Sequence, residues 1–327
     1  MNNECSFIHF REMLMLQQLG IEKVKIDLPF RLDHVNCFLA EGEKGYIVID
    51  TGLNDKKARA VWKEMLENKF VERIVLTHLH PDHSGYAGVL QLQTNASVFM
   101  TESDAKALEI IWTEEALPKL AKEYEEAAVP NQLSKSILSL TSNFSPSVTP
   151  IPQVNEFLQE GELIPIGNYL YEVIFTPGHS EGLVCFYNRE KNVLLSTDHI
   201  LPKITPNISY WFYGEKNPLQ SYENSLEKIK QLDADFVIPS HGNPFYGANE
   251  RIDEIWNHHV QRFDIILDSL QQPANIFEVC EVLFQRELSV YDYQFAIGET
   301  IAHLEYLREK GECIRELENG KWIYYRK

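Results

Sequence analysis

Apolar and polar positions in the first third of the chain predict strands separated by helices. Three apolar, β-branched runs predict strands at 24–28, 34–40 and 46–50. Residues 54–69 begin with capping residues and continue at helical spacing, and the run at 71–76 predicts a buried strand. Strands that alternate with helices indicate an α/β fold.

The second half repeats this pattern. Apolar runs predict four strands, at 157–166, 169–175, 182–188 and 192–197. A helical segment near 217–231 then leads to another strand at 235–240. The repetition indicates two packed sheets with helices on their outer faces.

Residues 102–144 interrupt this pattern. The stretch is rich in Ala, Glu, Leu and Lys and is broken by Pro118 and Pro130, which predicts two or three inserted helices. Such an insertion either shapes a substrate pocket or adds packing on an outer face. At the N-terminus, residues 7–19 are compatible with a short helix whose role the sequence does not indicate.

The C-terminal pattern predicts a second domain. A long helical pattern at 251–270 ends before Pro273, which places the boundary between domains at 1–270 and 271–327. Two helical runs, at 276–284 and 300–311, and a pair of strands joined at Asn319–Gly320 follow, an order that resembles a winged helix, a small α+β domain. Winged helices often bind DNA, but the basic residues of this one form no dense basic face, because five glutamates lie between them: Glu305, Glu309, Glu312, Glu316 and Glu318. We therefore expect a scaffold or dimerisation role, with a homodimer as one possibility.

Charge narrows the classes of partner. The 327 residues include 30 Lys and Arg against 48 Asp and Glu, a formal net charge of −18. Such a surface repels polyanions, which disfavours nucleic acid as a partner, although a local basic groove could still bind it. No apolar run is long enough to span a membrane, and the opening residues mix charges with apolar positions, unlike a signal peptide. We therefore expect a cytoplasmic protein with a small-molecule substrate and no membrane partner.

Four candidate metal ligands lie within six positions directly after the run at 71–76. They are His78, His80, Asp82 and His83. An irregular loop can turn several of these side chains toward one point, and imidazole and carboxylate are common ligands of zinc, iron and manganese. The alternative is a solvated, histidine-rich loop.

Three further candidates each follow an apolar run directly: His179, Asp198 and His241. A layered α/β fold gathers such strand ends at one edge of its sheets. The series HxHxDH at 78–83, then these three residues in this order, resembles the metallo-β-lactamase-fold hydrolase superfamily. The resemblance implies an αββα sandwich with the candidate ligands at one edge.

The same resemblance implies a role for each ligand. His78, His80 and His179 would hold one divalent ion, Asp82, His83 and His241 a second, and Asp198 would bridge the two. Zinc is the first choice, with iron or manganese as alternatives, because nitrogen and oxygen ligand sets separate these metals poorly. The implied reaction is attack by a hydroxide shared between the ions. Asp82 would orient this hydroxide, so Asp82 and the bridging Asp198 are the implied catalytic residues.

Other residues near these ligands have two interpretations each. Asp50, in the DTG turn at 50–52, either orients the ligands from behind or serves as a turn or capping residue. The aromatic loop at 199–214 either lines a substrate pocket or belongs to the core. Its candidate pocket residues are Tyr210, Trp211, Phe212, Tyr213 and His199, the last of which is equally compatible with a packed histidine.

The run HHxxR at His258, His259 and Arg262 resembles one in the subgroup with a small C-terminal domain, which includes the β-lactamase-like protein 2 ribonucleases. Since these residues lie on a predicted helix, we expect a helix-surface or interface role rather than metal ligation.

The resemblance leaves several functions open. The first is a glyoxalase II-like hydrolase of a small-molecule thioester, ester or lactone, which the acidic surface and aromatic loop favour. The second is an endoribonuclease or phosphodiesterase of the β-lactamase-like protein 2 type, which the C-terminal module favours and the net charge disfavours. β-Lactam hydrolysis and iron-dependent redox chemistry fit less well. A non-enzymatic metal-sensing or partner-binding protein is the alternative from another class.

Overall fold

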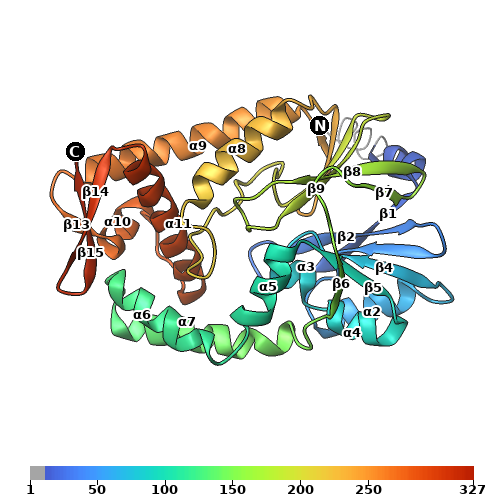
Figure 1. Ribbon diagram of the computed structural model, residues 1–327, viewed down its shortest axis with the longest axis horizontal. Helices are drawn as coiled ribbons and strands as arrows, with labels where there is room; N and C mark the ends of the chain where they lie inside the picture. Colours follow the sequence, from blue (N-terminus) through green and yellow to red (C-terminus); the bar gives the residue numbers. More distant parts are fainter. Residues whose placement is uncertain (1–11) are drawn as a thin grey trace.

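The computed structural model describes residues 12–327, and within them two six-stranded sheets pack face to face (Figure 1). The first sheet has the order β1-β2-β3-β4-β5-β6. Its strands are β1 (Ile21–Asp27), β2 (His34–Glu41), β3 (Tyr46–Ile49), β4 (Val71–Val75), β5 (Ser97–Met100) and β6 (Val154–Phe157). Pairing is antiparallel from β1 to β3 and parallel from β3 to β6.

The second sheet has the order β12-β11-β10-β9-β8-β7. Its strands are β7 (Leu163–Ile166), β8 (Tyr169–Phe175), β9 (Val184–Asn188), β10 (Val193–Thr197), β11 (Phe236–Pro239) and β12 (Phe245–Tyr246). Because β10 and β11 are parallel and β8 is separated from β10 by the antiparallel β9, the strands β8, β10 and β11 all end at the same edge.

Apolar side chains from both sheets fill the space between them. The buried cluster includes Phe38, Ile49, Val75, Val184, Phe186, Leu195 and Ile238. Residues 12–19 are helical, and Leu16 and Leu19 join this cluster, whereas positions 7–11 of the predicted N-terminal helix lie outside the described residues. The two predicted sheets are therefore confirmed, with a continuous apolar core between them.

Helices cover the outer faces. On the first sheet lie α2 (Lys56–Met65) and α4 (Ala87–Thr94), which bury Trp62 and Leu90 respectively, and the short α3 (Pro81–Ser84) precedes α4. On the second lie α8 (Pro218–Lys230) and α9 (Ala248–Ser269) (Figure 1). The insertion at 102–144 forms three helices, as its composition predicts. They are α5 (Glu102–Ile111), α6 (Ala116–Glu126) and α7 (Asn131–Phe144), followed by the 3-10 turn η1 (Ser145–Ser147).

One predicted strand is wrong. The run at 157–166 is divided, because β6 ends at Phe157 in the first sheet and β7 begins at Leu163 in the second. The chain reverses between them at Gly161, whose φ of 76° lies in the left-handed region that favours glycine. The polar residues 159–162, with Gly161 among them, mark this turn in the sequence, but they do not indicate that the chain changes sheet.

The C-terminal residues form a helical and sheet unit: β13 (Ala274–Asn275), α10 (Ile276–Leu283), α11 (Val290–Glu309), β14 (Cys313–Glu318) and β15 (Lys321–Arg326). Asn319 and Gly320, both at positive φ, join β14 to β15 and confirm the predicted hairpin. Residues 296–307 of α11 are buried without interruption, since the helix packs against α7, α8, α9 and α10. This unit therefore shares one apolar core with the second sheet's outer face.

No helix among residues 12–327 combines the length and the apolar character that crossing a membrane requires.

Candidate metal centre

The seven candidate ligands lie in segments that follow the ends of four strands, and two of them, Asp82 and His83, lie in the short helix α3. His78, His80, Asp82 and His83 follow β4, His179 follows β8, Asp198 follows β10 and His241 follows β11. The last three strands end at one edge of the second sheet, and the loop after β4 meets them there from the first sheet. The structure brings all seven residues together in three overlapping groups.

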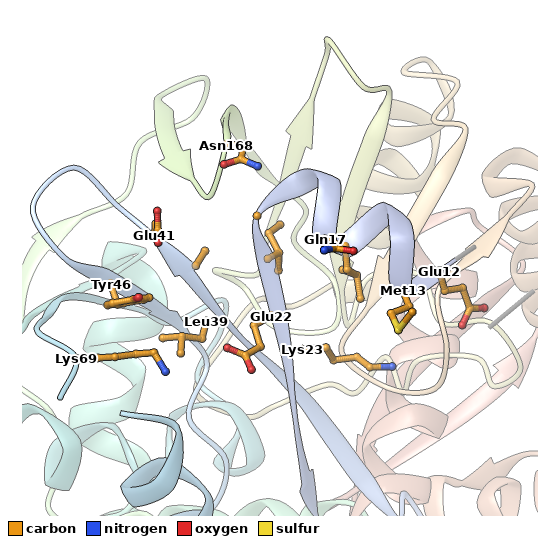
Figure 2. A pocket seen from close by; sticks show the side chains of 14 residues that line it. Glu12, Met13, Gln17, Glu22, Lys23, Leu39, Glu41, Tyr46, Lys69 and Asn168 are labelled. Carbon is orange, nitrogen blue, oxygen red and sulfur yellow. The ribbon is translucent and has the colours of Figure 1, made fainter. Parts of the chain in front are cut away.

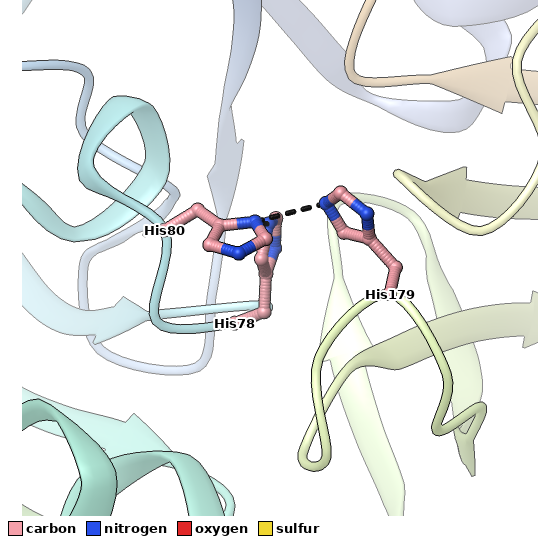
Figure 3. Close-up of side chains that lie close together, drawn as sticks. All are labelled: His78, His80 and His179. Atoms are coloured by element: carbon pink, nitrogen blue, oxygen red, sulfur yellow. Dashed lines mark hydrogen bonds between the residues drawn. The ribbon is translucent and has the colours of Figure 1, made fainter. Parts of the chain in front are cut away.

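The first group is His78, His80 and His179 (Figure 3). His80 Nδ1 lies 3.0 Å from His78 Nε2 and 2.9 Å from His179 Nε2. Figure 3 shows the His179 ring reaching across from the opposite sheet to meet the other two. Ligands about 2.1 Å from a tetrahedral zinc ion stand about 3.4 Å apart, so a small outward shift of these rings would let them share a cation.

The second group is Asp82, His83 and His241. Asp82 Oδ2 lies 3.4 Å from His241 Nε2 and 3.7 Å from His83 Nε2. Asp198 stands between the groups. Its Oδ2 atom is 3.2 Å from His241 Nε2 and 3.6 Å from His179 Nε2, while its Oδ1 atom is 3.5 Å from His83 Nε2. The Asp198 carboxylate therefore lies close to ring nitrogens of both groups.

Hydrogen bonds behind the rings fix which nitrogen carries the lone pair. His179 Nδ1 donates to the carbonyl oxygen of Asn207 at 2.8 Å, and His241 Nδ1 donates to that of His34 at 2.7 Å. His83 Nδ1 donates to Asp50 Oδ2 at 2.8 Å. Since each Nδ1 is a donor, each Nε2 presents a lone pair to the site.

His78 has its lone pair fixed in the same way, through Thr77. The Thr77 hydroxyl donates to Asp50 Oδ2 at 2.8 Å, so it accepts from His78 Nδ1 at 3.0 Å. Asp50 also accepts from the Thr77 backbone N–H at 2.9 Å. The structure thus places Asp50 behind two candidate ligands, where it holds their orientation.

Several ligand atoms are buried without any hydrogen-bond partner. They are His83 Nε2, His241 Nε2 and Asp198 Oδ1. Unpaired buried acceptors are costly in a protein interior, and a divalent cation at their centre would satisfy those that converge. The residues present therefore fit a metal ion.

Electrostatics divide the ligands into two sets. Burial is the main cause that lowers the pKa of His80 to about 3, and it also lowers the pKa values of His78 and His179, so these rings are neutral. Burial alone would lower the pKa of His241 too, but the carboxylates of Asp198 and Asp82 raise it to about 10. The half of the site that contains the carboxylates therefore attracts positive charge, which either protons or a divalent ion can supply.

A further carboxylate links the two ligand loops. Asp104, on α5, accepts from the backbone N–H of Leu79 at 2.8 Å, from Ser180 Oγ at 2.9 Å and from the Gly182 N–H at 2.7 Å. A Cβ atom at Gly182 would lie 2.0 Å from Thr101 Oγ1, so only glycine permits this approach. No sequence signal distinguishes Asp104 from the other acidic residues of the insertion.

The predicted pocket residues divide between site and core. The Trp211 ring lies 6.0 Å from the His80 ring and stacks on Tyr213 at 6.2 Å, so both belong to the surroundings of the metal centre. Tyr210 is buried against Phe212 in the core. His199 is fully buried and packs edge-on against Tyr222 at 5.3 Å, with no surface open to a substrate.

Aromatic residues that the sequence analysis did not select extend from Trp211. Phe295 and Tyr291, one helical turn apart on α11, continue the row at ring separations of 6.0 and 5.0 Å. Phe30 stacks on Tyr291 at 5.2 Å and leads to Phe144 at 5.8 Å. In the sequence, the aromatic residues at 290–295 were the signal that could have indicated this row. The prediction placed them in a separate C-terminal domain, away from the metal centre. A pocket of about 650 Å³ lies away from this row, beside β1 and β2, and includes no candidate ligand (Figure 2).

Residues 30–241 match the family model described as the metallo-beta-lactamase superfamily. Residues 263–327 match the model described as the metallo-beta-lactamase-like C-terminal domain. Both halves of the predicted resemblance therefore have independent support.

Three similar proteins illustrate the relationship. The probable metallo-hydrolase YqjP of Bacillus subtilis is 26% identical over 93% of this chain and 96% of its own length. The crystal structure of a metallo-beta-lactamase family protein from Thermus thermophilus has a TM-score of 0.82 at 30% identity, covering 94% of this chain and 99% of that one. The acyl-coenzyme A thioesterase MBLAC2 of Gallus gallus is 26% identical over 71% of this chain and 80% of its own length.

The fold, the converging ligands and these similarities lead to one conclusion. The chain belongs to the metallo-β-lactamase superfamily and is a metallo-hydrolase with an αββα sandwich and an additional C-terminal unit.

Proposed function

We propose that this protein is a binuclear metal-dependent hydrolase of a small-molecule thioester, ester or lactone with an apolar acyl group. The observation that carries the proposal is the convergence of two groups of ligands on either side of Asp198, with the lone pairs of four histidines fixed by bonds behind the rings. His78, His80 and His179 would hold one ion, and Asp82, His83 and His241 the other. Zinc is the first choice, with iron and manganese as alternatives.

The residues around the proposed ions have different roles. Bound divalent ions supply Lewis acidity and lower the pKa of water toward neutrality. Asp82 has a side chain 17% exposed, against 7% for Asp198, so Asp82 is the carboxylate that meets solvent and substrate. Asp198 holds the two halves of the site at a fixed separation. Asp50 accepts from His83 directly and from Thr77, which in turn accepts from His78, so it keeps both histidine rings in the orientation that ligation requires.

The aromatic row supports an apolar acyl group. Trp211 lies beside His80, and Phe295, Tyr291 and Phe30 continue away from the metal centre. Half-buried aromatic rings offer large apolar contact areas and few charges to a substrate. The similarity to a protein named as an acyl-coenzyme A thioesterase supports thioesters within this class.

The ribonuclease alternative has less support. The element order β13-α10-α11-β14-β15, with the sheet order β13-β15-β14, supports a winged-helix-like unit. In such units a helix equivalent to α11 commonly enters the major groove, but here residues 296–307 are buried by the rest of the chain. We therefore propose a scaffold role for this unit. A homodimer and a cytoplasmic location stay predictions from the sequence.

The test combines metal analysis with a hydrolysis panel. Elemental analysis of untagged protein should find about two zinc ions per chain, and turnover of an ester or thioester should be lost on chelation and restored by Zn²⁺. Turnover of phosphodiesters alone would favour the ribonuclease alternative. A metal-loaded protein inactive on every ester, thioester, lactone and phosphodiester tested would favour the non-enzymatic metal-sensing role.

A further inference from the structure

The C-terminal unit reaches the metal centre through a short series of contacts that begins at His179. His179 Nδ1 donates to the carbonyl oxygen of Asn207 at 2.8 Å. This bond leaves the Nε2 lone pair facing His80 and Asp198. The position of the Asn207 carbonyl therefore decides both the tautomer and the direction of one candidate ligand.

Asn207 is itself held by α11. Its Nδ2 atom donates to Glu299 Oε2 at 3.0 Å, and its Oδ1 atom accepts from Ser209 Oγ. Nearby, the backbone N–H of Tyr210 donates to the carbonyl oxygen of Gly298 at 2.9 Å. A Cβ atom at Gly298 would lie 2.8 Å from Ser209 Oγ, so the segment 207–210 is pressed directly against the helix.

The HHxxR run on α9 converges on the same glutamate. Arg262 Nη1 lies 3.1 Å from Glu299 Oε1 as an ion pair, although without the alignment of a hydrogen bond. Arg262 Nε donates to His258 Nε2 at 2.8 Å, and the guanidinium covers the Phe284 ring. The side chains of Arg262 and Glu299 are 17% and 11% exposed, so little water competes for the pair.

The second histidine of the run reaches the backbone of Glu299. His303 Nδ1 donates to the Glu299 carbonyl oxygen at 2.7 Å, so His303 Nε2 accepts from His259 Nδ1 at 3.0 Å. Burial lowers the pKa values of both rings, which keeps them neutral, as this pairing requires. His258, His259 and Arg262 thus all contribute to holding Glu299, and none of them lies among the candidate metal ligands.

We propose that Glu299 is a positioning residue of the metal centre, which the HHxxR run holds in place and which acts on His179 through Asn207. The C-terminal unit is then a part of the metal site and not merely an appended module. This inference rests on the proposed metal site but not on the substrate. It gives the HHxxR run, for which the sequence predicts only a helix-surface or interface role, a specific function.

The test measures Co²⁺ binding by the full-length protein, through competition with a chromophoric chelator and through the visible spectrum of the bound ion. Glu299→Gln should weaken Co²⁺ binding about 10- to 100-fold, the usual effect of losing a residue that orients a ligand, and should alter the spectrum. Asn207→Ala should act in the same direction, although it keeps the carbonyl that accepts from His179, because the carbonyl loses its anchor.

Glu305→Gln is the matched control. Glu305 also lies on α11 and is buried, but its partners are Arg308, Arg315 and Tyr324, all within the C-terminal unit. The Co²⁺ affinity of the Glu305→Gln protein should remain within about twofold of the wild type, and its visible spectrum should not change. This should hold even if its free energy of unfolding falls.

Two outcomes would overturn the proposal. One is unchanged Co²⁺ affinity in both Glu299→Gln and Asn207→Ala. The other is an equal loss in Glu305→Gln, which would indicate a general structural effect. If Glu299→Gln does not fold, Asn207→Ala decides alone. Wild-type protein that binds Co²⁺ but hydrolyses no substrate would contradict the proposed function. The comparison of Co²⁺ affinities between the wild type and the variants would still test the role of Glu299.

Discussion

Asp104 Oδ2 accepts a hydrogen bond from the backbone nitrogen of Leu79, the residue between His78 and His80, at 2.8 Å. The same carboxylate binds Ser180 and Gly182, which follow His179. One side chain of the helical insertion therefore connects the two loops that carry the first group of candidate metal ligands. The insertion contributes to the metal centre as well as to the packing of the surface.

Asp104 should make stability depend on pH. Burial, opposed by its three hydrogen bonds, raises the pKa of this carboxyl to about 6. A raised folded-state pKa stabilises the protein below the unfolded pKa of about 3.8, and this contribution is lost as pH rises through about 6. In metal-free protein, the stability advantage of the wild type over Asp104→Asn should therefore shrink by about 2–3 kcal/mol from pH 4 to pH 7.

Urea unfolding in the presence of a chelator, at several pH values, measures this difference. Protonation of the site histidines is common to both proteins and cancels in the comparison. A stability difference that stays constant across this range would show that Asp104 is ionised throughout.

Asp50→Asn should weaken metal binding while preserving the backbone. Asp50 has a φ of 56°, which asparagine also tolerates, so the turn should survive. The amide would turn a donor toward either His83 Nδ1 or the donors of Thr77, and the loss of orientation should reduce Zn²⁺ affinity about 10- to 100-fold. Asp50→Ala should show the same loss together with a lower unfolding temperature, because alanine is strained at this φ. Chelator competition and thermal unfolding would separate the two effects, and unchanged affinity in both variants would contradict this role.

The sequence predicts the convergence of the seven candidate ligands for a physical reason. Each segment that carries them follows an apolar run, and the C-terminal ends of β8, β10 and β11 lie at one edge of the second sheet, where the segment after β4 meets them. The residues that support the candidate ligands have no comparable sequence signal. Asn207 acts through a backbone carbonyl, which any residue provides, and Asp104 and Glu299 are two among 48 acidic residues. Their partners are distant in sequence, and only the folded chain brings them together.

The extent of α11 shows a second limit. The predicted helix at 300–311 misses the N-terminal half, which begins at Val290 after a capping box formed by Ser289 and Asp292. Because residues 296–307 are buried on all sides, the helix has no polar face and its apolar period is weak. Sequence periodicity therefore underestimates the one helix that joins the C-terminal unit to the site.

Asp198→Asn should reduce hydrolysis by at least about 100-fold, more than the loss of a residue that merely supports a ligand. The amide retains one oxygen but loses the charge that places Asp198 between His241, His179 and His83. Elemental analysis should find fewer than two ions per chain after dialysis, whereas the wild type should retain both. A variant that keeps two ions and wild-type turnover would contradict the bridging role.

The aromatic row should select for the acyl group of the substrate. Trp211→Ala removes the ring nearest to His80, and Phe295→Ala removes the next one on α11. Losing an aromatic contact of about 1–1.5 kcal/mol should lower kcat/KM about 10-fold for esters with long or aromatic acyl groups. Acetyl esters, which do not reach the row, should be affected little, and metal content should not change. Tyr210→Phe is the control, because Tyr210 lies buried in the core beside this loop. If both alanine variants lower kcat/KM equally for short and long acyl groups, the row does not bind the acyl chain.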